Sequence, residues 1–338
     1  MKRFYCHCGQ EVFFDNTYCN SCNSILGFDT EQQSILSIEP YKGQFRSVES
    51  PEKRYKRCVH HQHLMQCNWL LPADDNFTQC ISCRLTRVIP NQNYPYNVKR
   101  WSVLEAAKRR MLYGLLRLGL PIDQWPSTDT QQLQFHFLED QISNPIDGHE
   151  QVFSGHAAGI ITLNASEADN SYREATREAM NEPYRTLLGH FRHEIGHFYW
   201  EKLIKNQPIY DAFKALFGDD TIDYPQALAA YYEAGPPEDF QQEFISAYAS
   251  AHALEDWAET WAHYLLMHET LETAVEFEVI RPPETDREFH VWLSEWMQLV
   301  LVLNALNRSI GNADAYPFVV STAVQKKLQF IHDLMHDI

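Results

Sequence analysis

No cysteine occurs after position 83 of this 338-residue chain, although the first 83 residues hold eight. Any disulfide framework or thiolate metal site is therefore confined to the N-terminal part. The start, "MKRFYCHCGQ", also lacks the apolar segment of a signal peptide. We therefore expect a cytoplasmic protein. Thiols in the cytosol stay reduced and are available as metal ligands.

Long apolar runs and an excess of basic charge are also missing. The longest apolar run, "WMQLVLVLNAL" at 296–306, is too short to cross a bilayer and is typical of a core helix. Residues 1–90 hold 10 Lys and Arg against 9 Asp and Glu, which leaves 18 against 36 in residues 91–338 and a net charge of −17 for the chain. An acidic body repels nucleic acid and anionic membranes, so we expect neither as a partner.

The cysteines form two sets of four, each built around a C-x-x-C pair. "CHC" and "CNSC" supply the first set, and two single cysteines with "CISC" supply the second: Cys6, Cys8, Cys19 and Cys22; Cys58, Cys67, Cys80 and Cys83. A C-x-x-C turn lets two thiolates reach one Zn²⁺ at about 2.3 Å, and two such pairs complete a tetrahedral site. The spacing predicts two structural zinc sites. In the second set His60, His61 and His63 are competing ligands, and we favour the four cysteines.

Two domains are expected, with a boundary near the proline- and asparagine-rich stretch at 87–97. Residues 1–90 would form a small β zinc-ribbon module, in which 23–57 connect the two cysteine sets. Residues 91–338 would form a mostly helical domain with a small sheet. Strands are expected at 133–140 and 159–166, and helices dominate from about 172. The fold class is therefore α+β.

A possible catalytic metal site begins at "FRHEIGHFYW" (191–200), which contains the pattern H-E-x-x-H. On the helix predicted over 182–204, His193 and His197 lie one turn apart on one face and can reach one zinc at about 2.0–2.1 Å. Glu194 can then take a proton from zinc-bound water as general base. Gly196 would let another segment approach closely. The alternative is a pair of core histidines, each of which would need a hydrogen-bond partner.

The third ligand is expected on a second helix, over 245–265. This segment combines apolar residues with four candidate ligands: Glu255, Asp256, Glu259 and His263. Burying an unpaired carboxylate is costly, and metal ligation would offset that cost. Glu255 could be the ligand and Glu259 the carboxylate that orients a ligating imidazole. The alternative is an amphipathic helix with a solvated acidic side.

These segments, "EPYRTLLGHFRHEIGHFYW" and "ISAYASAHALEDWAETWAHYL", together with the cysteine pattern, resemble a bacterial family of zinc-binding metallopeptidases that carry an N-terminal zinc ribbon. The likeness covers nearly the whole chain. It implies a zincin-like fold and a zinc hydrolase of gluzincin type, whose third ligand is a Glu on a later helix. "ETWAHY" (259–264) is similar to a segment of zinc aminopeptidases and favours Glu259. "EDWAE" (255–259), seven residues after Tyr248, is similar to anthrax lethal factor and favours Glu255, which we prefer.

That second alignment also implies a role for Tyr248, as hydrogen-bond donor to the developing oxyanion. This chain departs from the thermolysin-like pattern in that Glu255 follows His197 by 58 positions. The insertion within 216–240 could wall or cover the cleft.

The sequence thus predicts a zinc-dependent peptidase with one catalytic and two structural Zn²⁺ ions. Its partners would be a peptide or protein substrate, paired with a sheet edge at 159–164, and a protein bound by the zinc ribbons. The alternative is a non-proteolytic zinc-ribbon adaptor or regulatory protein that binds protein or nucleic acid. The intact Glu194 argues against it, because such a protein needs no general base.

Overall fold

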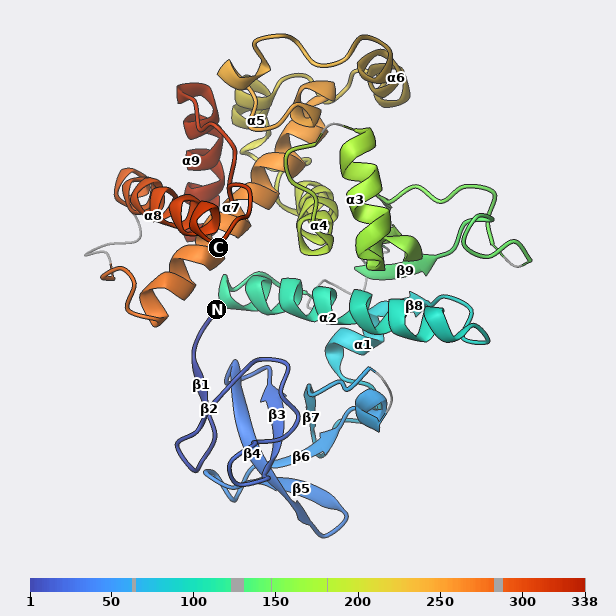
Figure 1. Cartoon of the computed structure of the whole chain (residues 1–338), viewed down its shortest axis with the longest axis vertical. Coiled ribbons are helices and arrows are strands. Elements are labelled where there is room, and N and C mark those ends of the chain that lie inside the picture. The colour runs from blue at the N-terminus through green and yellow to red at the C-terminus, as the bar shows by residue number, and fades with distance from the viewer. Residues whose placement is uncertain (63–64, 123–130, 147, 181, 283–287, 338) are drawn as a thin grey trace. The chain divides into compact units, whose positions relative to one another are not determined.

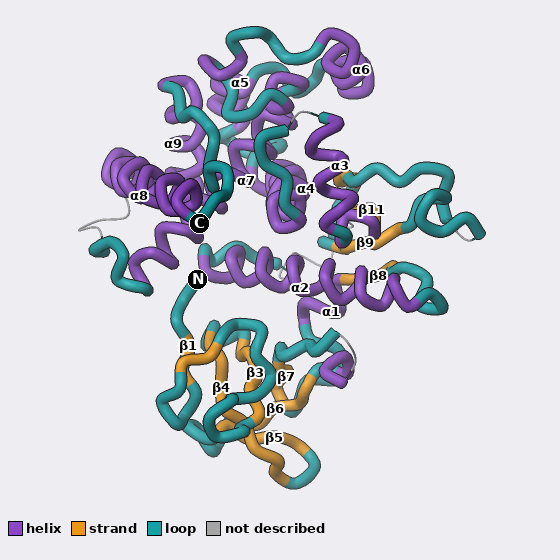
Figure 2. Tube along the Cα trace, viewed as in Figure 1, coloured by secondary structure: helices purple, strands orange, loops and turns teal. Residues whose placement is uncertain are grey.

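The computed structural model describes the chain except for residues 63–64, 123–130, 147, 181, 283–287 and 338 (Figure 1). The fold is α+β, as predicted. The chain divides into two compact units, one of residues 2–175 and one of residues 176–338 with Met1. Strands occur only in the first unit within the described ranges (Figure 2).

The cysteine module is built on strands. A two-stranded ribbon and a five-stranded antiparallel sheet of order β3-β4-β5-β6-β7 follow one another. Their bounds are β1 Phe4–Tyr5, β2 Glu11–Val12, β3 Ile25–Asp29, β4 Ser34–Tyr41, β5 Gln44–Ser47, β6 Arg54–Arg57 and β7 Leu70–Pro72. Leu36, Ile38, Tyr55 and Leu70 form a buried apolar cluster on this sheet. Residues 23–57 are therefore most of a sheet and not a simple connector.

A long helix belongs to the same unit as the cysteine module. Helix α2 (Pro95–Arg117) carries Tyr113, whose ring lies 5.0 Å from that of Phe14 and 5.7 Å from that of Phe28. All three rings are almost fully buried. Burial of large aromatic side chains is a major source of stabilisation, so this cluster joins the module firmly to the helix.

The rest of the first unit is a four-stranded sheet of order β10-β11-β9-β8. Its elements are α1 Ile81–Leu85, β8 Thr86–Val88, β9 Gln134–Leu138, β10 Gly155–Ala157, β11 Ile160–Asn164, the 3₁₀ helix η2 Ala165–Ala168 and the start of α3 Asn170–Ala179. The two predicted strands are β9 and β11. The prediction that 159–164 is a sheet edge is wrong, because β11 pairs with β10 on one side and β9 on the other.

The second unit is helical in its described part. Its elements are α4 Leu187–Leu203, α5 Tyr210–Phe217, α6 Tyr224–Ala234, the 3₁₀ helices η3 Phe240–Gln242 and η4 Tyr248–Ala251, α7 Ala253–Glu276, α8 Phe289–Ser309 and α9 Thr322–Asp337. Helix α4 lies against α7. A Cβ on Gly196 would stand 3.2 Å from the Ala258 Cα and 3.1 Å from Trp261 Cδ1, so the glycine permits the close approach that was predicted.

Helix α8 corrects the prediction of a core helix at 296–306. The helix has 21 residues, and by length and composition alone it is apolar enough to cross a membrane. Only 28% of its most apolar window is buried. Trp292 and Trp296 face the interior, whereas Leu301 and Leu306 are exposed. One face of α8 is therefore buried, and its other apolar face is exposed.

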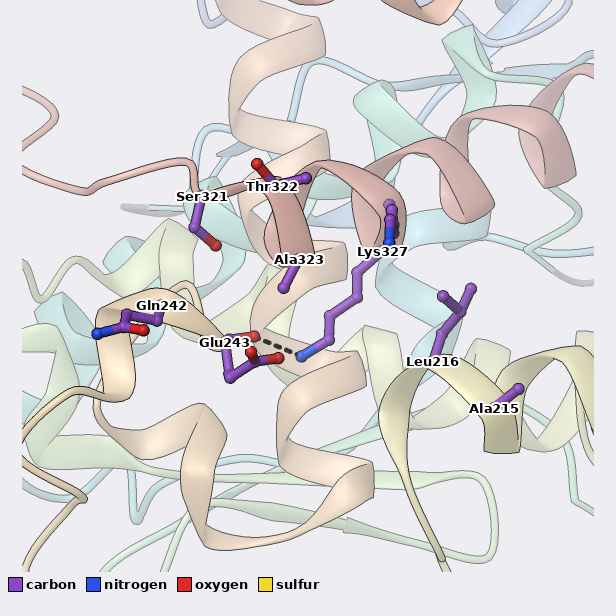
Figure 3. Close-up of a pocket in the computed structure, with 9 residues that line it drawn as sticks. Ala215, Leu216, Gln242, Glu243, Ser321, Thr322, Ala323 and Lys327 are labelled. Carbon is purple, nitrogen blue, oxygen red and sulfur yellow. Dashed lines mark hydrogen bonds between the residues drawn. The ribbon is translucent and has the colours of Figure 1, made fainter.

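A buried ion pair ties the start of α7 to α9. The Lys327 Nζ lies 2.6 Å from Asp256 Oδ2 and donates to the main-chain oxygen of Glu243 at 2.6 Å. Figure 3 shows this lysine reaching Glu243. Both residues line a pocket of about 550 Å³ formed by α5, η3 and the start of α9. Burial raises the pKa of Asp256 to about 7 although Lys327 lowers it. Asp256, a candidate zinc ligand, is thus engaged by a lysine.

Replacement of Lys327 by Met should destabilise the protein by about 3 kcal/mol, because it leaves a buried carboxylate without its cation. The loss should grow as the pH rises above about 7. The Asp256 pKa in the folded wild type, about 7, already lies above its unfolded value, and without Lys327 it rises further, so only the variant still takes up a proton on folding above that pH. Urea unfolding at several pH values measures this. A Lys327→Met/Asp256→Asn double variant should remove the pH dependence, and its persistence would contradict the explanation.

Candidate metal centres and active site

The first cysteine set is gathered into one cluster. The Sγ atoms of Cys6 and Cys22 lie 3.5 Å apart and those of Cys8 and Cys19 lie 3.7 Å apart. A tetrahedron with zinc–sulfur bonds of about 2.3 Å separates its sulfur atoms by about 3.8 Å. A disulfide would require about 2.05 Å, and all four cysteines are free. Cys6 and Cys19 are buried, whereas Cys8 and Cys22 are exposed. The set therefore fits a tetrahedral metal site at the surface of the module.

The second set has the same geometry but lies in the interior. The Sγ of Cys67 is 3.6 Å from that of Cys80 and 3.7 Å from that of Cys83. Cys58 completes the cluster, and all four cysteines are buried. Among the competing histidines, His61 hydrogen-bonds the main-chain oxygen of Cys58 at 2.7 Å and His60 packs against Trp101; His63 lies outside the described residues. This arrangement favours four thiolates as the donor set.

A buried arginine supports thiolates in this second set. Arg109 on α2 is 4% exposed. Burial lowers its pKa, and the nearby Cys67 and the buried carboxylate of Glu105 raise it. A zinc ion bound by four thiolates carries a net charge of about −2. Burying a guanidinium requires such a counter-charge, because an unpaired buried charge is very costly. Arg109 thus fits an anionic metal–thiolate cluster.

The two motif histidines and Glu255 meet at one point in the helical unit. Helix α4 presents His193 and His197 with their Nε2 atoms 3.2 Å apart. Glu255 on α7 places Oε2 3.1 Å from His193 Nε2 and Oε1 3.4 Å from His197 Nε2. Tetrahedral zinc with bonds of about 2.0–2.1 Å separates its ligand atoms by about 3.3 Å. These three side chains therefore fit a His₂Glu zinc site with room for a fourth ligand.

Burial and charge at Glu255 agree with a ligand role. Its side chain is 1% exposed, and Oε2 accepts no hydrogen bond from the described residues. Burial alone would raise its pKa, but His197 and His193 hold the pKa of Glu255 well below the usual range. An ionised carboxylate with a buried oxygen that accepts no hydrogen bond is suited to bind a cation.

Glu259 lies one helical turn further on and holds the other side of His193. The His193 Nδ1 is 2.7 Å from Glu259 Oε1, and the Ser246 hydroxyl donates to Oε2 at 2.6 Å. With the Nδ1 proton directed at a carboxylate, the Nε2 lone pair of His193 faces the metal position. Of the two alignments, the geometry supports Glu255 as ligand and Glu259 as the residue that orients His193. His263 hydrogen-bonds Tyr316 at 2.8 Å instead.

Glu194 is buried beside this cluster and retains an uncommitted oxygen. It is 7% exposed, and its Oε2 has no hydrogen-bond partner among the described residues. Burial raises the pKa of Glu194, whereas His193 and His197 lower it. A carboxylate with a pKa closer to neutrality and a free oxygen is a suitable general base.

Two tyrosines reach the cluster, of which the sequence predicted one. The ring of Tyr248 lies 6.0 Å from that of His193. Tyr224, at the start of α6 in the insertion, donates a hydrogen bond to Glu255 Oε1. Partial burial and the Glu255 carboxylate raise the pKa of both tyrosines, so both hydroxyls stay protonated. No sequence pattern pointed to Tyr224, because its separation from Glu255 matches no motif.

The assignment of the third ligand can be tested by paired substitutions. Glu255→Gln should lose the zinc of this site, because the amide removes the anionic ligand. Glu259→Gln should keep the ion but bind it about 10- to 100-fold more weakly, as expected for a group that orients a ligand. Metal analysis after dialysis and competition with a chromophoric chelator measure both effects. The reverse order of severity would assign the ligand role to Glu259.

These features define an α+β zinc-binding protein with two cysteine clusters and a His₂Glu centre. The chain belongs to the family described as "Putative zinc-binding metallo-peptidase", which matches residues 97–334. A zinc-ribbon domain matches residues 3–94. The family indicated by the motifs, with its N-terminal zinc ribbon, is thus confirmed.

Two relatives are similar over nearly their whole length. An uncharacterized protein of Mycobacterium bovis and one of Mycobacterium tuberculosis are each 40% identical over 347 aligned residues, which cover 100% of this chain and 96% of the relative. No solved structure matches the chain.

Proposed function

We propose that the protein is a zinc-dependent peptidase of gluzincin type that hydrolyses peptide bonds. The observation that carries the proposal is the approach of His193, His197 and Glu255 to tetrahedral spacing, with the free oxygen of Glu194 buried beside them. Structural zinc sites use four protein ligands, whereas catalytic sites keep one position open. Three ligands with an adjacent base therefore support a catalytic site.

Each residue has a defined part in the reaction. Zinc in such a site lowers the pKa of water and polarises a substrate carbonyl. Glu194 accepts a proton from the water that attacks the carbonyl carbon and returns it to the departing amine. The hydroxyl of Tyr248 donates to the oxyanion that forms. Glu259 keeps His193 in the ligating tautomer.

The two cysteine clusters would hold two structural zinc ions, which makes three per chain. Around the first cluster, Tyr5, Phe13 and Tyr18 are 48%, 68% and 50% exposed. Aromatic side chains are enriched in protein interfaces, so this surface supports a protein partner of the ribbon. We expect the peptidase to act in the cytoplasm on a peptide or protein substrate, without nucleic acid or membrane.

A peptide library tests the proposal. The zinc-loaded protein is incubated with the library, and products are identified by mass spectrometry. We expect cleavage that stops with a chelator and returns with added zinc. An absence of hydrolysis from a chain that holds three zinc ions would overturn the proposal in favour of the adaptor function.

A further inference from the structure

The insertion between the two metal-binding helices makes three contacts near the centre, one of them with the ligand Glu255. The main-chain oxygen of Ile222 is 3.2 Å from His252 Nε2, Tyr224 donates to Glu255, and the Tyr231 ring lies 5.7 Å from that of Tyr248. Helix α6 has no buried residue in its full length. Apolar packing therefore contributes little to its position, and these contacts with the centre hold it.

The contact of Tyr224 is specific to one oxygen of the third ligand. Both Glu255 oxygens face a motif histidine, Oε2 at 3.1 Å from His193 Nε2 and Oε1 at 3.4 Å from His197 Nε2. Tyr224 donates to Oε1, whereas Oε2 accepts no hydrogen bond from the described residues. A carboxylate with one oxygen fixed by a donor is held in one orientation, so the hydrogen bond favours Oε2 as the ligand atom.

The ring of Tyr224 also contacts the helix that carries Glu255. The ring meets that of His252 edge-on at 5.1 Å. His252 is the N-cap of α7, where its Nδ1 accepts from the Leu254 main-chain nitrogen at 3.1 Å. Tyr224, His252 and Glu255 thus form one connected unit at the start of α7.

We propose that Tyr224 is a positioning residue, which fixes Glu255 for monodentate metal binding and fastens the insertion helix α6 to the metal centre. Tyr224 is not the oxyanion donor, because its single hydroxyl proton is committed to Glu255. The inference rests on the proposed zinc centre, but it concerns metal binding and not hydrolysis.

The test is Tyr224→Phe, which keeps the ring against His252 and removes only the hydroxyl. We expect zinc affinity at the His₂Glu centre to fall about 10- to 100-fold, while both cysteine sites keep their zinc. Competition with a chromophoric chelator measures the affinity. The visible spectrum of the Co²⁺-substituted protein should also shift, because the carboxylate is no longer restrained to one oxygen. Neither readout needs a substrate.

Tyr232→Phe is the matched control, because Tyr232 lies on the same helix and is 59% exposed. It should leave affinity and spectrum unchanged. Equal affinity for Tyr224→Phe and wild type, or equal loss in both variants, would overturn the inference. A wild type that binds zinc only at its cysteines would overturn it together with the proposed function. A weakened centre in a chain that cleaves no peptide would support the inference and refute the peptidase alone.

Discussion

Replacement of Glu194 by Gln is expected to abolish peptide hydrolysis while the chain keeps all its zinc. The amide has nearly the shape of the carboxylate, and Glu194 is not one of the three ligand residues, so metal binding should persist. The amide cannot act as a general base, and loss of general acid–base catalysis costs about 10²–10⁴-fold in rate. The kcat on a cleaved peptide and the zinc content of the same sample measure the two effects.

Glu201→Gln is the control for this experiment, since Glu201 lies on the same helix outside the motif. It should change neither kcat nor zinc content. Near-normal hydrolysis by Glu194→Gln would exclude this residue as the base. Loss of zinc from Glu194→Gln would instead assign it a part in metal binding.

Replacement of Cys80 by Ala should unfold the unit of residues 2–175. Cys80 is 0% exposed and belongs to the buried cluster, so its loss leaves three thiols and Arg109 in the interior without a complete set of four ligands for the proposed zinc. Structural zinc contributes about 10–16 kcal/mol in zinc-finger peptides. Domains are stable by only about 5–15 kcal/mol. Unfolding is measured by far-UV circular dichroism and limited proteolysis of the full chain, and zinc content by metal analysis.

Cys22→Ala is the matched comparison, because Cys22 is exposed and belongs to the cluster at the surface of the module. It should lose one zinc ion and leave the five-stranded sheet and α2 protected from protease. A Cys80→Ala variant with full zinc content and an unchanged melting temperature would refute the structural role of the buried cluster.

The metal centre could be predicted from sequence because its parts are local. His193 and His197 occupy one face of one helix, and Glu255 and Glu259 lie four positions apart, about one turn, on another. The cysteine pairs are likewise set by short turns. Each motif needed only its own helix or hairpin to form, so the residues that meet in space could be named in advance.

The features that escaped prediction have different causes. The strands β3 to β7 pair in chain order, as Phe28 does with Ile35, but several are short and follow one another closely enough to resemble a connector in sequence. The edge partner of β11 is β10, which is only three residues long and carries little strand signal. Tyr224 approaches Glu255 across 31 positions, and helix periodicity carries no information about that contact.

Zinc content before and after disruption of the His₂Glu centre tests the central claim most directly. The purified chain should hold three zinc ions, and a His193→Ala/His197→Ala variant should hold two while its cysteine module stays folded. Two ions in both proteins would contradict the account, because the two motif histidines and Glu255 would then bind no metal.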